Sequence, residues 1–465
     1  MRTLTGLDAR RNILDPIHGS IPITPIENKI ISTPLFQRLR KITQLSQAPL
    51  VFPGATHNRF QHSLGTMHVI DKLLNTLEQK EKLPKDRNAY KKVIQSMRLA
   101  ALLHDCGHLP FSHTFENKYK NKNINHDYFS KCLITKSMLR DVLSNNGYDP
   151  NNIASIIEGQ PLSTNPNFRS FLILYPLLNS EFDADRMDYL LRDSYFTGVP
   201  YGKFDLDRIC NLITLEEDYL CFDEKAQTAV EDFLFSRYQM YRIVYIHKTV
   251  ICYELIIHKI YNNYFEKYKE KVDIPFFLPS VKQFEQSSFN WYNNVFCNLS
   301  ESDFFKSIEI LLESDVLENE DEQTLKKLYR RITFRIPIKN CFKFDDITEG
   351  TVAEYADREL ELFERIKEYP RIVNHWSFLR HDPSNPLRIT DPIKKQVSED
   401  RQEATSIRIL TAKEKRNQKI RLLQERTNSV IKKLAQHHTI LIYYYHERKR
   451  AQRIIKELAN KIIKE

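Results

Sequence analysis

Three histidines, among them His104 and His108, and the carboxylate of Asp105 gather in residues 104–113. An apolar run at residues 97–103, typical of a buried helix, leads directly into this stretch. Burying such polar side chains is costly unless a partner compensates them. Neutral imidazole and carboxylate together form the ligand set of Zn, Mn, Fe or Ni and, with waters, of Mg. The stretch therefore predicts a divalent-metal site and leaves the identity of the ion open.

The spacing of these side chains limits which of them can share one ion. His104 and His108 are four residues apart and lie on one face while the helix lasts. The adjacent His104 and Asp105 point about 100° apart on a helix, so both reach one ion only at the border between two helices. Further ligands must therefore come from other segments.

A second polar group lies at residues 57–65, where His57, Arg59 and His62 mark the start of a helix expected to continue through Leu73. A helix start is well suited to bind an anion or to carry a metal ligand. A lone histidine there is more often a structural residue. The presence of residues 104–113 in the same chain favours the functional interpretation.

Acidic side chains recur at helical spacing among apolar residues in 183–193. Asp185 and Tyr189 share one helix face, and Asp188 and Arg192 share another. One interpretation is an ion pair on an exposed helix. The apolar neighbours indicate instead that part of this helix is buried, in which case at least one acid needs a buried partner such as a metal.

Long helices are the expected scaffold, because only 10 of the 465 residues are glycine. We predict a helix at residues 91–103, a hairpin at 214–222, one continuous helix at 226–264 and strands at 332–344. An aromatic and basic stripe within the third of these segments either packs in the core or stacks a base and binds phosphates: Arg237, Tyr241, Tyr245 and Lys248. Three basic residues near residue 40 face either solvent or an anion: Arg38, Arg40 and Lys41.

The composition, 41% hydrophobic and 28% charged, is that of a soluble globular protein. Charged residues interrupt every apolar run before the roughly 18 residues that a membrane span requires, so no membrane association is expected. The seven cysteines lack C-x-x-C spacing and, with no secretory signal visible, predict reduced thiols and a cytoplasmic location. A formal charge of +9 permits an anionic partner without identifying one. The Lys- and Arg-rich segment 411–465 either packs on its own domain or a sister subunit, or binds nucleic acid.

The order of His62, His104, Asp105 and Asp185 resembles the pattern that defines the HD phosphohydrolase superfamily. The surrounding motifs are more specific. They resemble deoxynucleoside triphosphate triphosphohydrolases, in the branch of the sterile-alpha-motif/HD enzyme of vertebrates and its bacterial dGTPase-like relatives, at residues 15–19, 37–40, 52–54, 57–65, 104–113, 185–189 and 245–248. The likeness covers about residues 10–265.

This resemblance implies a mainly α fold, an HD-domain helical bundle with small β-hairpins and an α+β C-terminal region. We divide the chain into a catalytic domain at 1–265, an α+β lobe at 266–410 and a basic amphipathic helical segment at 411–465. The resemblance further implies a homo-oligomer, either a tetramer or a dimer of dimers, a dNTP or GTP effector, and a role in nucleotide-pool control or antiviral (phage) defence.

The resemblance also assigns roles to individual residues. The metal ligands would be His62, His104, Asp105 and Asp185. The catalytic group would contain the acid–base pair His126 and Glu116, with His108 and His113 near the α-phosphate. The substrate-binding residues would be Gln44, Leu45, Arg59, Arg186, Tyr189, Asp193, Arg237, Tyr241, Tyr245 and Lys248, with Leu45 leaving no room for a 2′-hydroxyl.

Three functions remain open at this point. The first is metal-dependent hydrolysis of dNTP to deoxynucleoside and inorganic triphosphate. The second is hydrolysis of another nucleotide phosphoester by the same metal site. The third is a nucleotide-sensing, nucleic-acid-binding protein. Gln44, Leu45 and Asp193 favour the first over the second. Two departures affect the details, because Arg186 replaces a lysine and Tyr241 a histidine of the family pattern.

Overall fold

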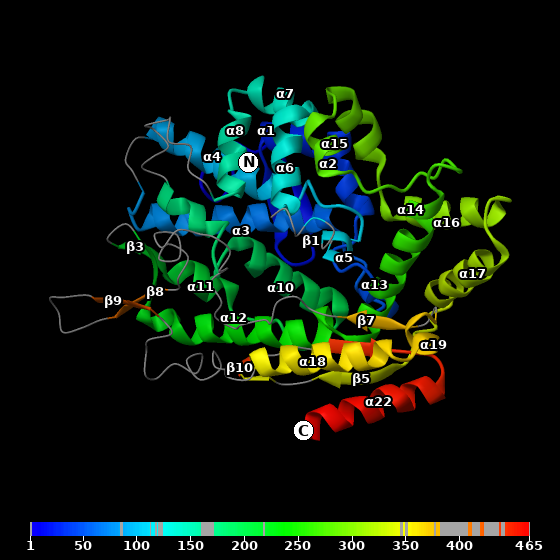
Figure 1. Ribbon diagram of the computed structural model, residues 1–465. Helices are drawn as coiled ribbons and strands as arrows, with labels where there is room; N and C mark the ends of the chain where they lie inside the picture. Colours follow the sequence, from blue (N-terminus) through cyan, green and yellow to red (C-terminus); the bar gives the residue numbers. More distant parts are fainter. Residues whose placement is uncertain are drawn as a thin grey trace.

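The computed structural model describes residues 2–83, 87–111, 113–116, 119, 124–159, 172–216, 219–344, 347–348, 352–375, 378–381, 408–411, 419–422, 437–438 and 442–464. These residues are mainly helical, and their strands form four small sheets of two to four strands each (Figure 1). The expected fold class, mainly α with small hairpins, is confirmed. No described helix has the length and apolar character needed to cross a membrane.

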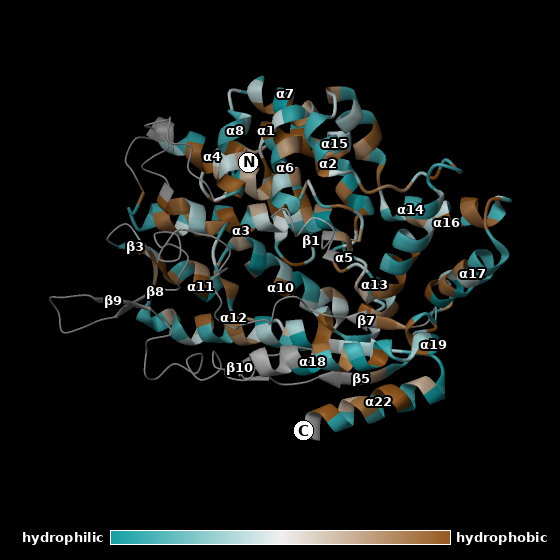
Figure 2. Ribbon diagram, in the orientation of Figure 1, coloured by the Kyte–Doolittle hydropathy of each residue, from teal (hydrophilic) through white to brown (hydrophobic). Residues whose placement is uncertain are grey.

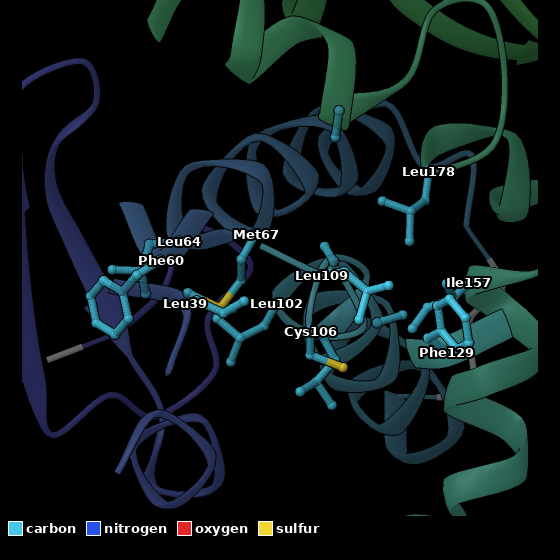
Figure 3. Close-up of a cluster of buried hydrophobic side chains, with 14 of the residues drawn as sticks. Leu39, Phe60, Leu64, Met67, Leu102, Cys106, Leu109, Phe129, Ile157 and Leu178 are labelled. Carbon is cyan, nitrogen blue, oxygen red and sulfur yellow. The ribbon is translucent and has the colours of Figure 1, made fainter. Parts of the chain in front are cut away.

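Three helices form the centre of the fold: α3 (Arg59–Gln79), α4 (Arg87–Leu103) and α10 (Ala184–Thr197). Helix α3 packs against both of the others. Its start is fixed by a capping box, in which the side chains of Asn58 and Gln61 accept each other's backbone N–H groups. Figure 3 shows Phe60, Leu64 and Met67 of α3 in the apolar cluster that also holds Leu102 and Leu109. The helix predicted to start within residues 57–65 and the helix predicted at residues 91–103 are therefore confirmed as α3 and α4.

Helix α10 lies close to α3 because Gly65 has no side chain. A Cβ atom there would lie 1.8 Å from Oδ1 of Asp188 and 2.4 Å from Nη2 of Arg192. The Asp183 side chain caps the start of α10, and Gly198, with φ at +74°, ends it in a left-handed conformation. The contact brings the acids of α10 against the histidines of α3.

The prediction of a single continuous helix at residues 226–264 is wrong. The structure has α12 (Gln227–Met240), a wider π-helical turn at Tyr241–Tyr245, a break, and α13 (Lys248–Ile260). At the break His247 is extended, and its side chain accepts the N–H of Thr249. Hydroxyl groups of Tyr443 and Tyr445, almost 200 residues away, donate to the carbonyls on either side of His247. Local periodicity carries no signal of such distant partners.

The strand predictions are confirmed in part. Strands β3 (Ile213–Glu216) and β4 (Tyr219–Asp223) form the predicted antiparallel hairpin. Of the segment 332–344, only β5 (Asn340–Phe344) is a strand, because Ile332 belongs to the buried face of α17 (Asn319–Thr333). The other strands are β1 (Arg11–Asp15), β2 (Gly19–Ile23), β6 (Ile347–Thr348), β7 (Leu379–His381), β8 (Arg408–Thr411), β9 (Lys419–Leu422), β10 (His437–His438) and β11 (Ile442–Tyr445).

The main hydrophobic core is one cluster of buried residues drawn from positions between Ile21 and Ile338, and it also includes Leu379, Tyr443 and Tyr445. A second, small core joins α18 (Val352–Lys367) to α22 (Lys449–Lys464), whose apolar and polar residues alternate in Figure 2. The domain boundaries at 265 and 410 stay predictions. The remaining helices are α1 (Pro25–Ile31), α2 (Pro34–Gln37), α5 (His113–Glu116), α6 (His126–Lys136), α7 (Met138–Ser144), α8 (Pro150–Ile157), α11 (Leu206–Leu212), α14 (Glu266–Tyr268), α15 (Val281–Gln286), α16 (Glu301–Glu313) and α19 (Pro370–Val373).

Candidate metal centre and adjoining cavity

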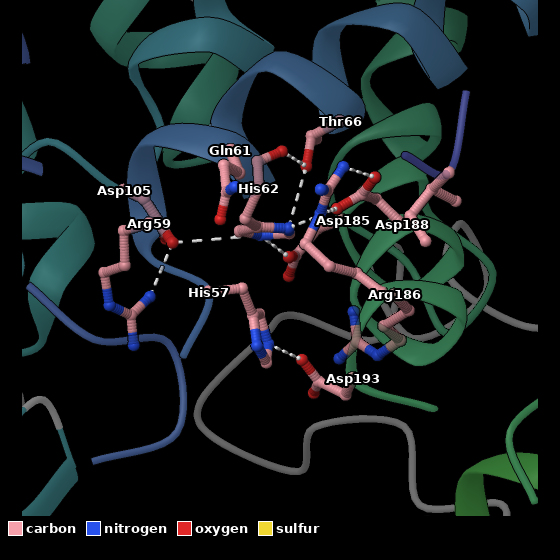
Figure 4. A network of polar contacts seen from close by, with 12 residues as sticks. His57, Arg59, Gln61, His62, Thr66, Asp105, Asp185, Arg186, Asp188 and Asp193 are labelled. Atoms are coloured by element: carbon pink, nitrogen blue, oxygen red, sulfur yellow. Dashed lines mark hydrogen bonds and ion pairs between the residues drawn. The ribbon is translucent and has the colours of Figure 1, made fainter. Parts of the chain in front are cut away.

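The four predicted metal ligands converge where α3, the end of α4 and α10 meet. Nε2 of His62 lies 2.8 Å from Oδ1 of Asp185 and 3.8 Å from Oδ2 of Asp105 (Figure 4). Nε2 of His104 lies 3.2 Å from Oδ1 of Asp105 and 3.5 Å from Oδ1 of Asp185. His62, His104 and Asp105 are buried, and their ligand atoms lie within 4.8 Å of one another. The structure thus brings together side chains that are up to 123 residues apart.

The protonation of His104 tests whether this cluster suits a cation. Nδ1 of His104 lies 2.8 Å from the carbonyl of Ala101, and because a carbonyl only accepts, this nitrogen carries the hydrogen. In the neutral ring Nε2 then bears a lone pair, which faces the carboxylates of Asp105 and Asp185 and has no hydrogen bond among the described residues. A lone pair against two carboxylate oxygens is repulsive unless a positive charge lies between them. The donor set therefore fits a divalent cation.

The pKa values of the two histidines reflect the same negative field. Burial alone would lower the pKa of His62, but hydrogen bonds with Asp185 and Asp188 raise it to about 10. Burial likewise opposes the charged form of His104, while Asp105 and Asp185 raise its pKa above the ordinary value. The cluster thus stabilises positive charge at the position where its donor atoms meet.

A second layer of buried groups orients His62. Nδ1 of His62 lies 2.7 Å from Oδ2 of Asp188, so the Asp188 carboxylate holds a hydrogen on Nδ1 and leaves Nε2 directed at the cluster. Asp188 also accepts from Nε2 of His18 at 2.6 Å and from Arg192 at 2.8 and 2.9 Å. Arg192 in turn donates to Asp15 at 2.8 Å. The interpretation of Asp188 and Arg192 as an exposed ion pair is wrong, because both side chains are fully buried.

Sequence reasoning missed Asp15 and His18 as parts of this layer. His18 and Asp188 are 170 residues apart, and no helical or strand spacing relates them. Their only signal in the chain was the resemblance of residues 15–19 to a family motif.

His57, which was a metal or anion candidate, has a different role. Its Nε2 lies 2.7 Å from Oδ1 of Asp193, and it stacks on Phe196 with ring centroids 4.7 Å apart.

Two arginines near the cluster are buried. Arg59, the first residue of α3, donates to Oδ2 of Asp105 at 2.5 Å. Burial alone would raise the pKa of Asp105, but His104, Arg59 and His108 hold it well below its ordinary value. The expectation that Arg38 faces solvent or an anion is wrong, because Arg38 is fully buried and donates to backbone carbonyls.

His108 and His126 form a stacked pair beside Asp105. Their ring centroids are 4.0 Å apart at an interplanar angle of 17°, and Nε2 of His108 lies 3.3 Å from Oδ1 of Asp105. Burial lowers the pKa of His108 well below its ordinary value, which keeps its ring neutral. Asp105, His108 and His126 also offer ligand atoms within 4.8 Å of one another. The side chains of the other two predicted catalytic residues, His113 and Glu116, lie outside the described residues.

A cavity of about 350 Å³ opens from the metal cluster. Its lining includes His62, Asp105, Asp185, His108 and His126, together with eight of the ten predicted substrate-binding residues: Gln44, Leu45, Arg59, Arg186, Tyr189, Asp193, Tyr241 and Tyr245. Among the described residues, its lining does not include Arg237 or Lys248. Arg237 instead forms an ion pair with Glu181, which is buried. The sequence did not point to Ser46, Ala48, Val244, Val250 or Glu254, which complete the wall.

One part of this wall presents polar atoms in fixed positions. Asp193 accepts from His57 and, at 2.7 Å, from the hydroxyl of Tyr245. Burial and the neighbouring Asp193 carboxylate hold the pKa of Tyr245 well above its ordinary value, so its hydroxyl stays a donor. Oε1 of Gln44 is buried and accepts no hydrogen bond within the described part of the chain. An unpaired buried amide oxygen is costly, so a ligand donor at this position would relieve it.

Two family models match the chain. The HD domain matches residues 59–193, which contain the four predicted metal ligands, and the HD associated region matches residues 204–275. The chain is 38% identical over 253 residues to the protein YwfO of Bacillus subtilis, covering 53% of this chain and 54% of YwfO. It is 29% identical over 386 residues to the bovine (Bos taurus) deoxynucleoside triphosphate triphosphohydrolase SAMHD1, covering 76% and 62% of the two chains. The chain spans about half of the length of several curated relatives that it matches, between 46% and 60% for YwfO and two further proteins.

A crystal structure of a phosphohydrolase from Bacteroides thetaiotaomicron is similar in fold to most of this chain. The similarity covers 94% of this chain and 100% of that one, with a TM-score of 0.67 and 25% sequence identity. The geometry of the ligands and the match of the family models agree on the same residues. Residues 59–193 therefore form an HD domain, and residues 204–275 form the HD-associated region that follows it.

Proposed function

We propose that this protein is a metal-dependent phosphohydrolase that converts dNTP to a deoxynucleoside and inorganic triphosphate. The observation that carries the proposal is the continuity of the cavity. Residues of the His and Asp cluster line the same cavity as an apolar side chain and polar groups that suit a sugar. The likeness to SAMHD1 and to the Bacteroides phosphohydrolase supports the same reaction class.

The four side chains His62, His104, Asp105 and Asp185 would hold the divalent ion. When bound, such an ion polarises a phosphoryl oxygen and makes an attacking water more acidic. Mn, Mg, Fe, Zn and Ni all suit these ligands, with waters completing the shell of Mg.

Residues of this chain would bind the triphosphate and move the proton. Arg59 and Arg186 line the cavity, and guanidinium groups bind phosphate oxygens in pairs. When water attacks the α-phosphorus, the bond to the 5′-oxygen breaks and that oxygen takes up a proton. We assign to His126, which stacks on neutral His108, the supply of this proton and its recovery from the attacking water, and Glu116 would orient the ring. His113 would contact the α-phosphate, and Arg237 and Lys248 would approach the phosphates only after a rearrangement.

The sugar pocket would account for selection of deoxynucleotides. Leu45 is an apolar part of the wall, and Gln44 and Asp193 supply acceptors for the 3′-hydroxyl. A 2′-hydroxyl against Leu45 loses its water without gaining a partner, at a cost of about 1–3 kcal/mol. That cost corresponds to a preference of roughly tenfold to hundredfold for dNTP over NTP. Tyr245 would stack on the sugar or base, and Tyr189, whose ring meets that of Tyr245 edge to face with centroids 6.2 Å apart, would lie beside the 3′-hydroxyl.

Incubation with each dNTP and NTP in the presence of Mn or Mg, with separation of the products by chromatography, tests the proposal. Triphosphate and deoxynucleoside are the expected products, and Leu45→Ala should narrow the difference between dATP and ATP more than it changes the dATP rate. Equal kcat/KM for dATP and ATP in the wild-type protein would reject deoxynucleotide selection and favour the alternative phosphoester hydrolase.

Assembly and regulation remain part of the proposal. We expect a homotetramer or a dimer of dimers, and a dNTP or GTP effector. Light scattering with and without dNTP at micromolar concentration checks this, and a monomer under both conditions would contradict it. Nucleic-acid binding by segment 411–465 and a cytoplasmic role in nucleotide-pool control or antiviral defence rest on the sequence alone.

A further inference from the structure

Glu301 lies outside both regions that the family models match, yet its side chain reaches the loops of the cavity. It is the first residue of α16. Its Oε1 atom accepts from the backbone N–H of Thr43 at 3.1 Å, from the Thr43 hydroxyl at 2.7 Å and from the backbone N–H of Phe111 at 3.3 Å. One carboxylate oxygen thus links α16 to two separate loops.

Both loops belong to the site. Thr43 directly precedes Gln44 and Leu45, which line the cavity. Thr43 also pairs with Asn58, the residue that caps the start of α3. Phe111 lies three residues after His108, which also lines the cavity. The single Oε1 atom therefore connects the predicted sugar wall to the turn that follows the metal ligands His104 and Asp105.

The backbone of these loops needs external support. Ser46 has φ at +43° and Phe111 at +59°, left-handed conformations that are unfavourable for residues with a side chain. Such conformations persist only where surrounding contacts hold them. Glu301 accepts hydrogen bonds from Phe111 itself and from Thr43, which lies three residues before Ser46. Without these hydrogen bonds, fewer contacts hold the two loops in their left-handed backbone conformations.

Arg38 makes a second connection between the start of α16 and the His108–Phe111 turn. Arg38 is fully buried and donates from Nε to the carbonyl of Leu299 at 2.8 Å and from Nη2 to the carbonyl of His108 at 2.8 Å. Its guanidinium also lies over the ring of Phe296, 4.3 Å from the ring centroid. Residues 299–301 are therefore joined to the His108 turn at both ends.

We propose that Glu301 is a positioning residue that holds the Thr43–Ser46 loop against the His108–Phe111 turn, so that a residue beyond the HD-associated region fixes the shape of the substrate cavity without lining it. Burial raises the pKa of Glu301 to about 7 against the opposing effect of the Thr43 and Phe111 donors. Because Oε1 accepts the hydrogen bonds whether or not Oε2 carries a proton, the role rests on acceptance rather than on charge. The kinetic consequence rests on the proposed function, whereas the structural one does not.

Glu301→Ala, Glu301→Gln and Asp303→Ala separate positioning from simple stability. Asp303 caps the same end of α16 by accepting the N–H of Ser300 at 2.8 Å and touches neither loop, so it is a matched control. Amide hydrogen exchange at residues 43–46, at Leu109 and at Phe111 is the primary measurement. Glu301→Ala should accelerate exchange in both loops about tenfold or more, as expected for loss of about 1.4 kcal/mol of hydrogen bonding. Asp303→Ala should leave both loops protected, and Glu301→Gln, which keeps an acceptor oxygen, should stay near wild type.

Turnover supplies the second measurement. Glu301→Ala should raise KM and narrow the preference for dNTP over NTP, while Glu301→Gln restores both values. Unchanged loop exchange in Glu301→Ala, or equal acceleration in Asp303→Ala, would overturn the proposal. If Glu301→Ala does not fold, Thr43→Val decides, because it removes the hydroxyl donor alone and must accelerate exchange at residues 43–46. A protein that hydrolyses no dNTP would refute the proposed function and leave the exchange result valid.

Discussion

Replacement of Asp188 by asparagine would test how the buried second layer prepares the metal centre. Asp188 is fully buried and accepts four hydrogen bonds, one from His18, one from His62 and two from Arg192. Asparagine keeps the shape but turns one acceptor oxygen into a donor. The new amide group must then face a hydrogen-bond donor on at least one side, and the guanidinium of Arg192 loses one of its two counter-charges.

The expected effect has two separable parts. Removing one partner of a buried ion pair costs about 3–5 kcal/mol, and the remaining contact of Arg192 with Asp15 places the loss near the lower end. Since proteins are stable by about 5–15 kcal/mol, the variant should fold with a clearly lower melting temperature. The loss of the fixed hydrogen on Nδ1 of His62 should weaken metal binding by about tenfold to hundredfold.

Titration calorimetry with Mn measures the loss of metal affinity. The melting temperature in the presence of a chelator measures the loss of stability in the absence of metal. Asp15→Asn is the matched control, because Asp15 contacts Arg192 at 2.8 Å but does not contact His62. It should lower the melting temperature and leave metal affinity near wild type. Equal metal affinity in Asp188→Asn and the wild-type protein, or an equal loss in Asp15→Asn, would refute the orienting role of Asp188.

Three further predictions concern single positions. Asp105→Ala should abolish metal binding and hydrolysis while circular dichroism shows near-native helical content, and turnover by this variant after metal removal would contradict the ligand assignment. Gly107→Ala should destabilise the protein by about 1–3 kcal/mol in chemical denaturation. A Cβ atom at this position would lie 2.2 Å from the backbone nitrogen of Ser130 and 2.6 Å from the carbonyl oxygen of His126. An unchanged denaturation midpoint would show that α6 can move away freely. Burial raises the pKa of Glu301 from 4.5 to about 7, against the opposing effects of Thr43, the N–H of Phe111 and the charge of Arg59. Its neutral form is therefore favoured on folding, and the stability it contributes is lost as the pH rises through that range. The melting temperature of Glu301→Gln relative to wild type should therefore rise between pH 5 and 8, and a constant difference would count against the shift.

Side-chain chemistry and local spacing were enough to predict several features. Apolar residues at helical spacing predicted the helices that contain or precede the His and Asp motifs, and a hairpin was predicted at residues 214–222. Imidazoles beside carboxylates at the end of a buried helix indicated a metal site, because such groups are costly to bury without a cation. The family resemblance then selected His62 and Asp185 from among the other candidates.

The tertiary structure decided how those side chains are oriented and which distant residues support them. The break at His247 depends on the hydroxyls of Tyr443 and Tyr445. The orientation of His62 depends on Asp188, which is held by His18, and the loops of the cavity on Glu301. Hydrogen bonds of this kind join residues 126 to 258 positions apart. Helical and strand periods relate only near neighbours in the chain, so such partners become visible only when packing of the core has brought the segments together.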